Sequence, residues 1–286
     1  MINMFLRVHL TDNSHALASL ESDFCQSRTT FSVDSDSNGF RYSAIFDGTH
    51  FATGASKLFY HGLIFASSPR EGPRNWKPCV VKVLIKEKDC SQCSQYDNWI
   101  PDISCHKRTS LIARSFNQAT ETIVPRQSIE VCDFLVANIE IMGQRLSGDV
   151  KYQVGEFVSI EPILDGNCRR FNRISGTGSD DSAWLLQSFS HYSFCVSGNR
   201  YLTCGLKEIK AKNRYILTDP TIHSSEQVHG KKDNGILGMI LFISNHRCNR
   251  LCRALNLPSR YKPINPNERW ITVTMDTDNF DIDEDK

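Results

Sequence analysis

Two histidines and two cysteines in the C-terminal half form the strongest candidate for a metal site. The segment His246-Arg-Cys-Asn-Arg-Leu-Cys252 contains Cys248 and Cys252, four positions apart, so both thiols lie on one face if the segment is helical. Thiolate and imidazole are the ligands of structural Zn²⁺, and a closed tetrahedral site requires four of them. His191, far upstream, is the candidate fourth ligand. The spacing is equally consistent with a structural zinc site and with a pair of buried apolar thiols on a core helix.

A second group of potential metal ligands lies in a polar stretch that follows an apolar run. It contains Cys90, Cys93, Cys105 and His106. These residue types bind zinc at comparable spacings in other proteins. We interpret the stretch as a loop insertion with incidental thiols, and a second metal site is the alternative.

Lys82 is a charged residue in the middle of the apolar run Val80-Val-Lys-Val-Leu84. In a strand it shares a face with Val80 and Leu84, so its ammonium either reaches along the surface to water or is held by a counter-charge. In kinase-like N-lobes a lysine in such a strand contacts nucleotide phosphates. The run by itself favours an ordinary edge lysine that faces solvent, and a phosphate contact at Lys82 is the alternative.

Three further short motifs could contact phosphates or a metal ion. Gly54 and Ala55 lie in a turn before an apolar run, and Gly235 and Gly238 form a G-x-x-G pattern before a helix-like segment. Backbone N–H groups at such positions can receive an anion. Asp219, in Leu-Thr-Asp-Pro, follows a strand-like run and could hold Mg²⁺. Common glycine turns and an Asp-Pro turn are the alternatives.

The elements that must position these residues change in type along the chain. Runs of β-branched and aromatic residues separated by Gly and Pro predict strands, whereas apolar residues three and four apart predict helices. Strands are expected near residues 40–46, 58–65, 79–85, 129–141 and 156–164, and helices near 107–119, from 182 onward and at 237–255. This order favours an α+β protein with a β-rich N-terminal lobe.

Composition and charge exclude several classes of protein. The chain has 286 residues, with 33 Lys and Arg against 32 Asp and Glu, so its net charge of +1 provides no general attraction to nucleic acid or acidic membranes. It has no run of about 18 apolar residues and no apolar signal-peptide core. Without a signal peptide, its 11 cysteines indicate reduced thiols, with metal binding as the alternative, and their odd number argues against a fully paired disulfide framework. We predict a cytoplasmic protein with no nucleic-acid partner and no membrane insertion.

Taken in order, these segments resemble the alpha-kinase family of atypical protein kinases, which includes the myosin heavy chain kinases, elongation factor 2 kinase and the channel-kinases. Leu217-Thr-Asp-Pro220 and His246-x-Cys-Asn-x-x-Cys252 are the most specific motifs, and the resemblance extends over residues 40–260. The other matching stretches are 51–62, 80–82, 113–117, 157–166, 189–194, 221–223 and 235–239.

The resemblance implies a two-lobed protein-kinase-like α+β fold, with a β-rich N-lobe and a mixed C-lobe held together by zinc. The kinase domain would occupy residues 36–262, divided into an N-lobe at 36–155 and a C-lobe at 156–262. Residues 1–35 are expected to form a loosely ordered entry segment, and 263–286 an acidic, solvated tail.

The resemblance also implies the activity of a serine/threonine protein kinase, which transfers the γ-phosphate of MgATP to a protein hydroxyl. Lys82 and Asp219 would be the catalytic charges, Lys82 on the α- and β-phosphates and Asp219 as the Mg²⁺ ligand. Glu161 would lie at the hinge beside the adenine, and Arg170 would face the nucleotide or its phosphates. Ile163 is expected to complete the ATP-binding set together with Gly54 and Ala55.

Two further groups of residues receive roles from the same resemblance. Gly235 and Gly238 would serve the peptide-substrate side. His191, His246, Cys248 and Cys252 match the structural zinc site of the family one for one. The expected cofactors are therefore ATP, Mg²⁺ and Zn²⁺, and the expected partner is a protein substrate.

The chain departs from the family at one motif that matters for catalysis. The family carries D-[LI]-Q-G between the first zinc histidine and L-T-D-P, and its Asp acts on the substrate hydroxyl. Here Gly205 replaces that Asp and Lys207 replaces the Gln. Loss of a general-base-like acid lowers rates by about 10²–10⁴ without preventing ATP binding. The alternative is a catalytically impaired pseudokinase that acts as a nucleotide-binding or protein-interaction module.

Overall fold

A computed structural model describes residues 27–30, 41–67, 77–85, 96–142, 152–163, 168–170, 184–211, 213–259, 261–262 and 271–272. Most of the predicted entry segment and acidic tail lies outside these residues, as do Cys90 and Cys93. The described part divides into two compact units: one contains the residues up to His106 and from Cys132 to Cys168, and the other contains Lys107–Val131 and the residues from Arg169 onward. The domain limits expected from sequence stay predictions.

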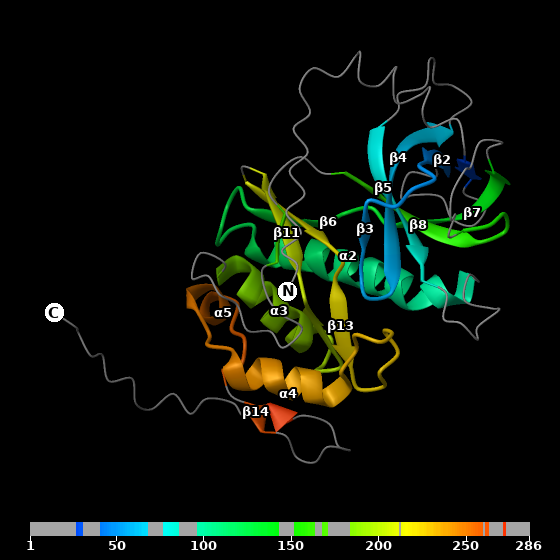
Figure 1. Cartoon of the computed structure of the whole chain (residues 1–286). Helices are drawn as coiled ribbons and strands as arrows, with labels where there is room; N and C mark the ends of the chain where they lie inside the picture. Colours follow the sequence, from blue (N-terminus) through cyan, green and yellow to red (C-terminus); the bar gives the residue numbers. More distant parts are fainter. Residues whose placement is uncertain are drawn as a thin grey trace, which may run out of the picture. The chain divides into compact units, whose positions relative to one another are not determined.

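Among the described residues, a curled seven-stranded sheet forms the first unit. Its order is β2-β1-β7-β8-β5-β4-β3, all neighbours are antiparallel, and an additional pairing of β2 with β4 closes the sheet on itself (Figure 1). The strands are β1 (Ser27–Thr30), β2 (Arg41–Phe46), β3 (Ala52–Thr53), β4 (Lys57–Ser67), β5 (Lys77–Leu84), β7 (Leu135–Met142) and β8 (Phe157–Pro162).

One face of this sheet forms the core of the unit. Cys79, Val81 and Val83 alternate along β5 and are buried in that core with Phe46 and Tyr60. Alternation follows from the pleat, which turns successive side chains to opposite faces. Burial of each such apolar side chain contributes about 1.5–3 kcal/mol. The residues between them, including Lys82, therefore lie on the opposite face of β5.

The long helix begins earlier than the sequence pattern predicts. A 3₁₀ turn, η1 (Tyr96–Trp99), leads directly into α2 (Ile100–Thr120). Pro101 is tolerated because an N–H in the first helical turn has no partner to lose. Cys105 and His106 therefore lie on this helix, not in a loop, and His106 stacks on Phe134 with 4.3 Å between ring centroids.

The expected strand at 129–141 is two strands in two different sheets. β6 (Ser128–Val131) pairs parallel with β12 in the second unit, whereas β7 belongs to the first. The order of the four-stranded sheet is β6-β12-β11-β9, and β10 pairs with β13. The remaining strands are β9 (Cys168–Arg170), β10 (Tyr201–Cys204), β11 (Lys207–Ala211), β12 (Arg214–Thr218), β13 (Thr221–Ser224), β14 (Tyr261–Lys262) and β15 (Ile271–Thr272).

Helices of the second unit pack on a separate core. α3 (Trp184–Val196) buries Leu185, Leu186 and Phe189 together with side chains of α2 and β12. The single helix expected at 237–255 is instead α4 (Gly235–Asn245) and α5 (Arg250–Ala254). None of the helices within the described ranges has the length and apolarity needed to cross a bilayer.

The break between α4 and α5 has a local cause. His246 adopts an extended backbone at the end of α4, and the Asn249 side chain accepts hydrogen bonds from the N–H groups of Leu251 and Cys252. Asn is a strong N-cap, because its side-chain oxygen satisfies N–H groups that have no partner within the helix. Cys248 therefore lies in the connecting loop, and the expectation that it shares a helix face with Cys252 is wrong.

Candidate nucleotide and metal sites

Lys82 and Glu161 form a buried ion pair in the first unit. The Lys82 ammonium donates to the Glu161 carboxylate, and each residue is only 4% exposed. The register of β5 and β8 places Val80 opposite Glu161, so Lys82 and Glu161 are diagonal neighbours on the same face. Lys82 is thus held by a counter-charge, one of the two expected alternatives. Contact of Glu161 with adenine stays a prediction.

The glycine turn expected to face phosphates packs beside this lysine. The Gly54 N–H donates to the Lys57 carbonyl at 2.7 Å and closes the turn between β3 and β4. A Cβ at Gly54 would lie 2.9 Å from Cε2 of Phe59, and Phe59 is directly opposite Lys82 across β4 and β5. The Lys82 ammonium lies 5.8 Å from the centroid of the Phe59 ring. Turn, ring and ammonium therefore form one small cluster.

For the other residues predicted to bind the nucleotide, the structure gives mainly their backbone positions. Ile163 directly follows β8, and its N–H donates to the Pro78 carbonyl at 3.0 Å. Ala55 belongs to the turn that Gly54 closes. Arg170 is the last residue of β9, and its side chain lies outside the described part.

Asp219 forms an ion pair with Lys207. The Lys207 ammonium donates to Oδ2 of Asp219 at 2.6 Å, and the two side chains are 31% and 19% exposed. The antiparallel register places Lys207 opposite Thr218, the residue before Asp219. Among the described residues, Asp219 belongs to no group of three or more His, Cys, Asp and Glu that could hold a metal ion. Because the Lys207 ammonium occupies Oδ2 of Asp219, a Mg²⁺ ion could bind this oxygen only after the ammonium moves away.

Backbone geometry on both sides of this pair is unusual. Asp219 has a φ of +49°, in the left-handed region, as the chain turns from β12 into β13. Gly205, two residues before Lys207, has a φ of +62°. Gly adopts this region at little cost, whereas other residues do so mainly in turns and at functional sites. No acidic side chain can project from position 205 itself.

The Gly235–Gly238 segment is tied down by a buried aspartate that the sequence pattern did not single out. Asp233 accepts hydrogen bonds from the N–H groups of Ser224 at 2.8 Å, His229 at 3.1 Å and Gly235 at 2.9 Å. Asp side chains often bond backbone N–H groups in turns, so an Asp two residues before a glycine was the available signal. A Cβ at Gly238 would lie 2.4 Å from Cδ2 of His223.

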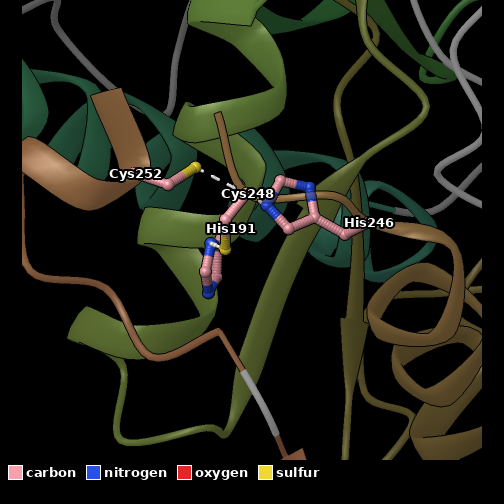
Figure 2. Close-up of side chains that lie close together, drawn as sticks. All are labelled: His191, His246, Cys248 and Cys252. Atoms are coloured by element: carbon pink, nitrogen blue, oxygen red, sulfur yellow. Dashed lines mark hydrogen bonds between the residues drawn. The ribbon is translucent and has the colours of Figure 1, made fainter. Parts of the chain in front are cut away.

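Figure 2 shows the four predicted zinc ligands converging from separate elements. His191 comes from α3, His246 and Cys248 from the loop between α4 and α5, and Cys252 from α5. Their potential ligand atoms all lie within 4.8 Å of one another, and His191 and Cys252 are fully buried. The structure therefore brings the four candidate zinc ligands together.

Distances between donor atoms allow a test of whether the group fits zinc. Sγ of Cys248 lies 3.7 Å from Nδ1 of His191, and Sγ of Cys252 lies 3.5 Å from Nε2 of His246. Zn–S and Zn–N bonds of about 2.3 and 2.0–2.1 Å at tetrahedral angles place sulfur and nitrogen about 3.5–3.6 Å apart. The donor set and spacing therefore fit a closed, four-coordinate zinc site.

The pKa values of the two thiols of this group are shifted in opposite directions. A hydrogen bond from Cys248 lowers the pKa of Cys252, helped by His191, His246 and Ser188, whereas the same bond and burial raise the pKa of Cys248. The Ser188 hydroxyl lies 3.3 Å from the Cys252 sulfur. These neighbours therefore stabilise the thiolate form of Cys252, which is the form of cysteine that binds a metal ion.

Comparison with known proteins identifies the family. The alpha-kinase family model matches residues 52–252. Myosin heavy chain kinase B of Dictyostelium discoideum is 28% identical over 217 residues, which cover 76% of this chain and 25% of that protein. Alpha-protein kinase vwkA of the same organism is 33% identical over 103 residues, which cover 35% of this chain and 16% of that protein. The chain thus spans a quarter or less of these relatives.

Solved structures confirm the predicted fold class. The alpha-kinase domain of myosin-II heavy chain kinase A, as the apoenzyme, aligns with a TM-score of 0.61 at 20% identity, covering 82% of this chain and 97% of that chain. The same domain in complex with AMP-PNP aligns with a TM-score of 0.60 at 21% identity, covering 82% and 96%. The fold is that of a two-lobed, kinase-like α+β protein, and the family implies use of ATP and Mg²⁺. From its match over residues 52–252, this chain belongs to the alpha-kinase family.

Proposed function

We propose that this chain binds ATP through Lys82 and transfers the γ-phosphate to a serine or threonine hydroxyl of a protein substrate. The observation that carries the proposal is the buried ion pair between Lys82 and Glu161 in a chain of the alpha-kinase family. Kinases hold a strand lysine against a glutamate so that its ammonium is fixed where the α- and β-phosphates bind. Here the glutamate comes from the neighbouring strand of the same sheet.

Each predicted nucleotide residue has a chemical role in this proposal. Lys82 neutralises phosphate charge, and Glu161 orients its ammonium. The turn at Gly54 and Ala55 lies against Phe59, whose ring is 5.8 Å from the Lys82 ammonium, and backbone groups of this turn would contact the phosphates. Ile163 and Arg170 would contact the base and the charged part of the nucleotide. Positioning and charge neutralisation supply most of the acceleration in phosphoryl transfer, and these residues would supply both at the nucleotide.

Two further parts of the proposal concern the second unit. His191, His246, Cys248 and Cys252 would hold a structural Zn²⁺, which joins α3 to the segment that contains α5 and stabilises the fold of this unit. Gly235 and Gly238 would serve the side that receives the peptide substrate. The cytoplasmic location and the absence of a nucleic-acid partner stay predictions from sequence.

A second candidate function is a nucleotide-binding module with little or no phosphoryl transfer. Gly205 and Lys207 favour this candidate, because they leave no carboxylate at position 205 and place an ammonium on Asp219. Loss of a group that orients the substrate hydroxyl lowers the rate of transfer but leaves phosphate contacts in the first unit intact.

The experiment that separates the candidates uses labelled ATP and thermal denaturation on the purified chain. A kinase incorporates label into the chain itself or into a mixture of serine- and threonine-containing peptides, and Lys82→Ala abolishes incorporation. Lys77→Ala is the matched control, because Lys77 is exposed on the same strand. An ATP-binding module incorporates no label, yet ATP at 100 times its Kd stabilises it by about 2.7 kcal/mol. If neither transfer nor stabilisation occurs, the proposal is wrong.

A further inference from the structure

Helix α4 has an apolar face that the described residues leave uncovered. Leu237 is 76% exposed, the largest value for any large apolar residue in the described part, and Leu241, one turn later on the same face, is 46% exposed. Met239 and Phe242 on the other side of the helix are fully buried in a small core of the second unit. A helix at the surface normally turns polar side chains toward water, so the leucine face has the composition of a contact surface.

Basic residues lie close to both ends of this helix in the chain. Two precede α4 and three follow it, and all five are exposed: Lys231, Lys232, Arg247, Arg250 and Arg253. The His246 ring stacks on Phe242 with 5.2 Å between centroids, so the segment that carries Arg247 begins against the end of α4. Over residues 226–253 there are only two acidic residues, and Asp233 is buried. The apolar face therefore lies in a basic region, which attracts an acidic partner.

The C-terminal segment 273–286 has the complementary composition. It lies outside the described residues, so only its sequence enters the argument. Four apolar residues are interspersed with acidic ones: Val273, Met275, Phe280 and Ile282 among Asp276, Asp278, Asp281, Asp283, Glu284 and Asp285. Its apolar side chains match the leucines of α4, and its carboxylates match the basic residues around them. A segment that alternates in this way has too few apolar residues for a core of its own and needs a partner surface to bury them.

The segment also starts within the unit that contains α4. It follows β15, which pairs with β14 so that Thr272 lies opposite Tyr261, and both strands belong to the second unit. Fourteen extended residues span about 46 Å. The 11 residues of α4 form a helix about 16 Å long. The segment is therefore long enough to lie along the whole helix.

We propose that residues 273–286 dock on the Leu237 and Leu241 face of α4 in the same chain, with their carboxylates toward the flanking basic residues. A tethered segment has an effective concentration of the order of 1 mM, so an affinity of about 100 µM as a free peptide keeps about nine-tenths of the chains docked. The inference does not depend on phosphoryl transfer. It replaces the solvated acidic tail expected from the sequence.

Fluorescence anisotropy of a labelled peptide with the sequence of residues 273–286 tests the docking on full-length protein. The wild type is compared with Phe280→Ser/Ile282→Ser, which removes apolar groups of the segment and leaves every described residue unchanged. The double variant should bind the peptide about tenfold or more tightly than the wild type, because its own segment no longer competes for the face. Salt raised from about 0.1 M to about 1 M should weaken this binding, because screening reduces the attraction between the acidic peptide and the basic residues.

A second comparison locates the peptide on α4. Added to the tail variant, Leu237→Asp/Leu241→Asp should abolish binding, because two carboxylates on the face repel the acidic peptide. Both leucines are changed together, since alanine at one position would leave the other leucine and the basic residues in place. Leu111→Asp, at a residue of α2 that is 64% exposed, is the matched control and should leave binding unchanged.

Each outcome supports or overturns the proposal. A tail variant that does not bind the peptide overturns it and leaves residues 273–286 a solvated tail. Equal binding to the wild type and the tail variant also overturns it, and this comparison changes no residue of the described part. Binding that survives both aspartates places the segment on another surface. If the wild type dimerises with rising concentration in sedimentation and the tail variant does not, the face receives the segment of a second copy and docking within one chain is refuted.

Discussion

Replacement of Lys82 by Met would break the buried ion pair and remove the ammonium that neutralises the Glu161 carboxylate. Both residues are 4% exposed, so water cannot replace the lost ammonium. Two unit charges about 4 Å apart attract each other by about 4 kcal/mol at an effective dielectric constant of 20. Removal of one partner of a buried pair costs about 3–5 kcal/mol. We therefore expect Lys82→Met to lower the free energy of unfolding of the first unit by that amount.

The double variant distinguishes charge coupling from lost packing. Glu161→Gln should cost less than Lys82→Met, because the amide still offers an oxygen to the ammonium. Lys82→Met/Glu161→Gln removes both charges of this pair, so its cost should fall short of the sum of the two single costs by about 2–3 kcal/mol. Lys77→Met, at an exposed position of the same strand, should change stability by less than about 0.5 kcal/mol.

Urea unfolding followed by far-UV circular dichroism and tryptophan fluorescence measures these changes. Trp99 is fully buried in the first unit, and its Nε1–H donates to the Phe157 carbonyl at the start of β8 at 3.0 Å, so its emission reports this unit. An equal m-value for all variants would show that the denatured and native states are unchanged in compactness. Single variants as stable as the wild type, or strictly additive costs, would refute the reasoning.

Two further changes test the second unit. Metal analysis should find about one zinc per chain, and Cys252→Ser should lose the metal and lower the melting temperature. Cys195→Ser, which changes a half-buried thiol outside the four-residue group, should retain the metal. A melting curve that chelators leave unchanged would contradict the zinc proposal. Gly238→Ala should lower the free energy of unfolding, measured by thermal denaturation, by about 1–3 kcal/mol, because its Cβ would lie 2.4 Å from the His223 ring. Leu237→Ala, at a residue that is 76% exposed, should lower it by less than about 0.5 kcal/mol. Equal costs would show that the helix relaxes away from His223.

Strands of the first unit could be predicted closely because their signal is local. Runs predicted at 40–46, 58–65 and 79–85 are strands at Arg41–Phe46, Lys57–Ser67 and Lys77–Leu84. Alternation of buried and outward side chains is a property of the pleat and is visible in consecutive residues. The predicted face of Lys82 follows from the same alternation, and the structure bears it out.

The limits of helices and strands in the second unit were harder to predict from sequence, because they depend on a single capping side chain or on a pairing partner far along the chain. The Asn249 cap ends the apparent helix at 237–255 and starts a new one, although the apolar pattern continues across it. The run at 129–141 has a continuous β pattern, yet Ser128–Val131 belongs to the second unit and pairs there with β12, far along the chain, whereas Leu135–Met142 belongs to the first unit. Pairing partners far along the chain leave no mark in the local period of a sequence.

The residue types of the site were determined by the sequence alone: two imidazoles and two thiols at metal-binding spacing, a lysine inside an apolar strand, and a glycine and a lysine in place of the acid and amide of the family motif. The tertiary structure decided which of these meet. Register between β5 and β8 gave Lys82 its glutamate, and register between β11 and β12 gave Asp219 its lysine. Composition and spacing specify what chemistry a side chain can perform, but its partner depends on which strands lie side by side, and a shift of one residue would turn each of these charges to the opposite face.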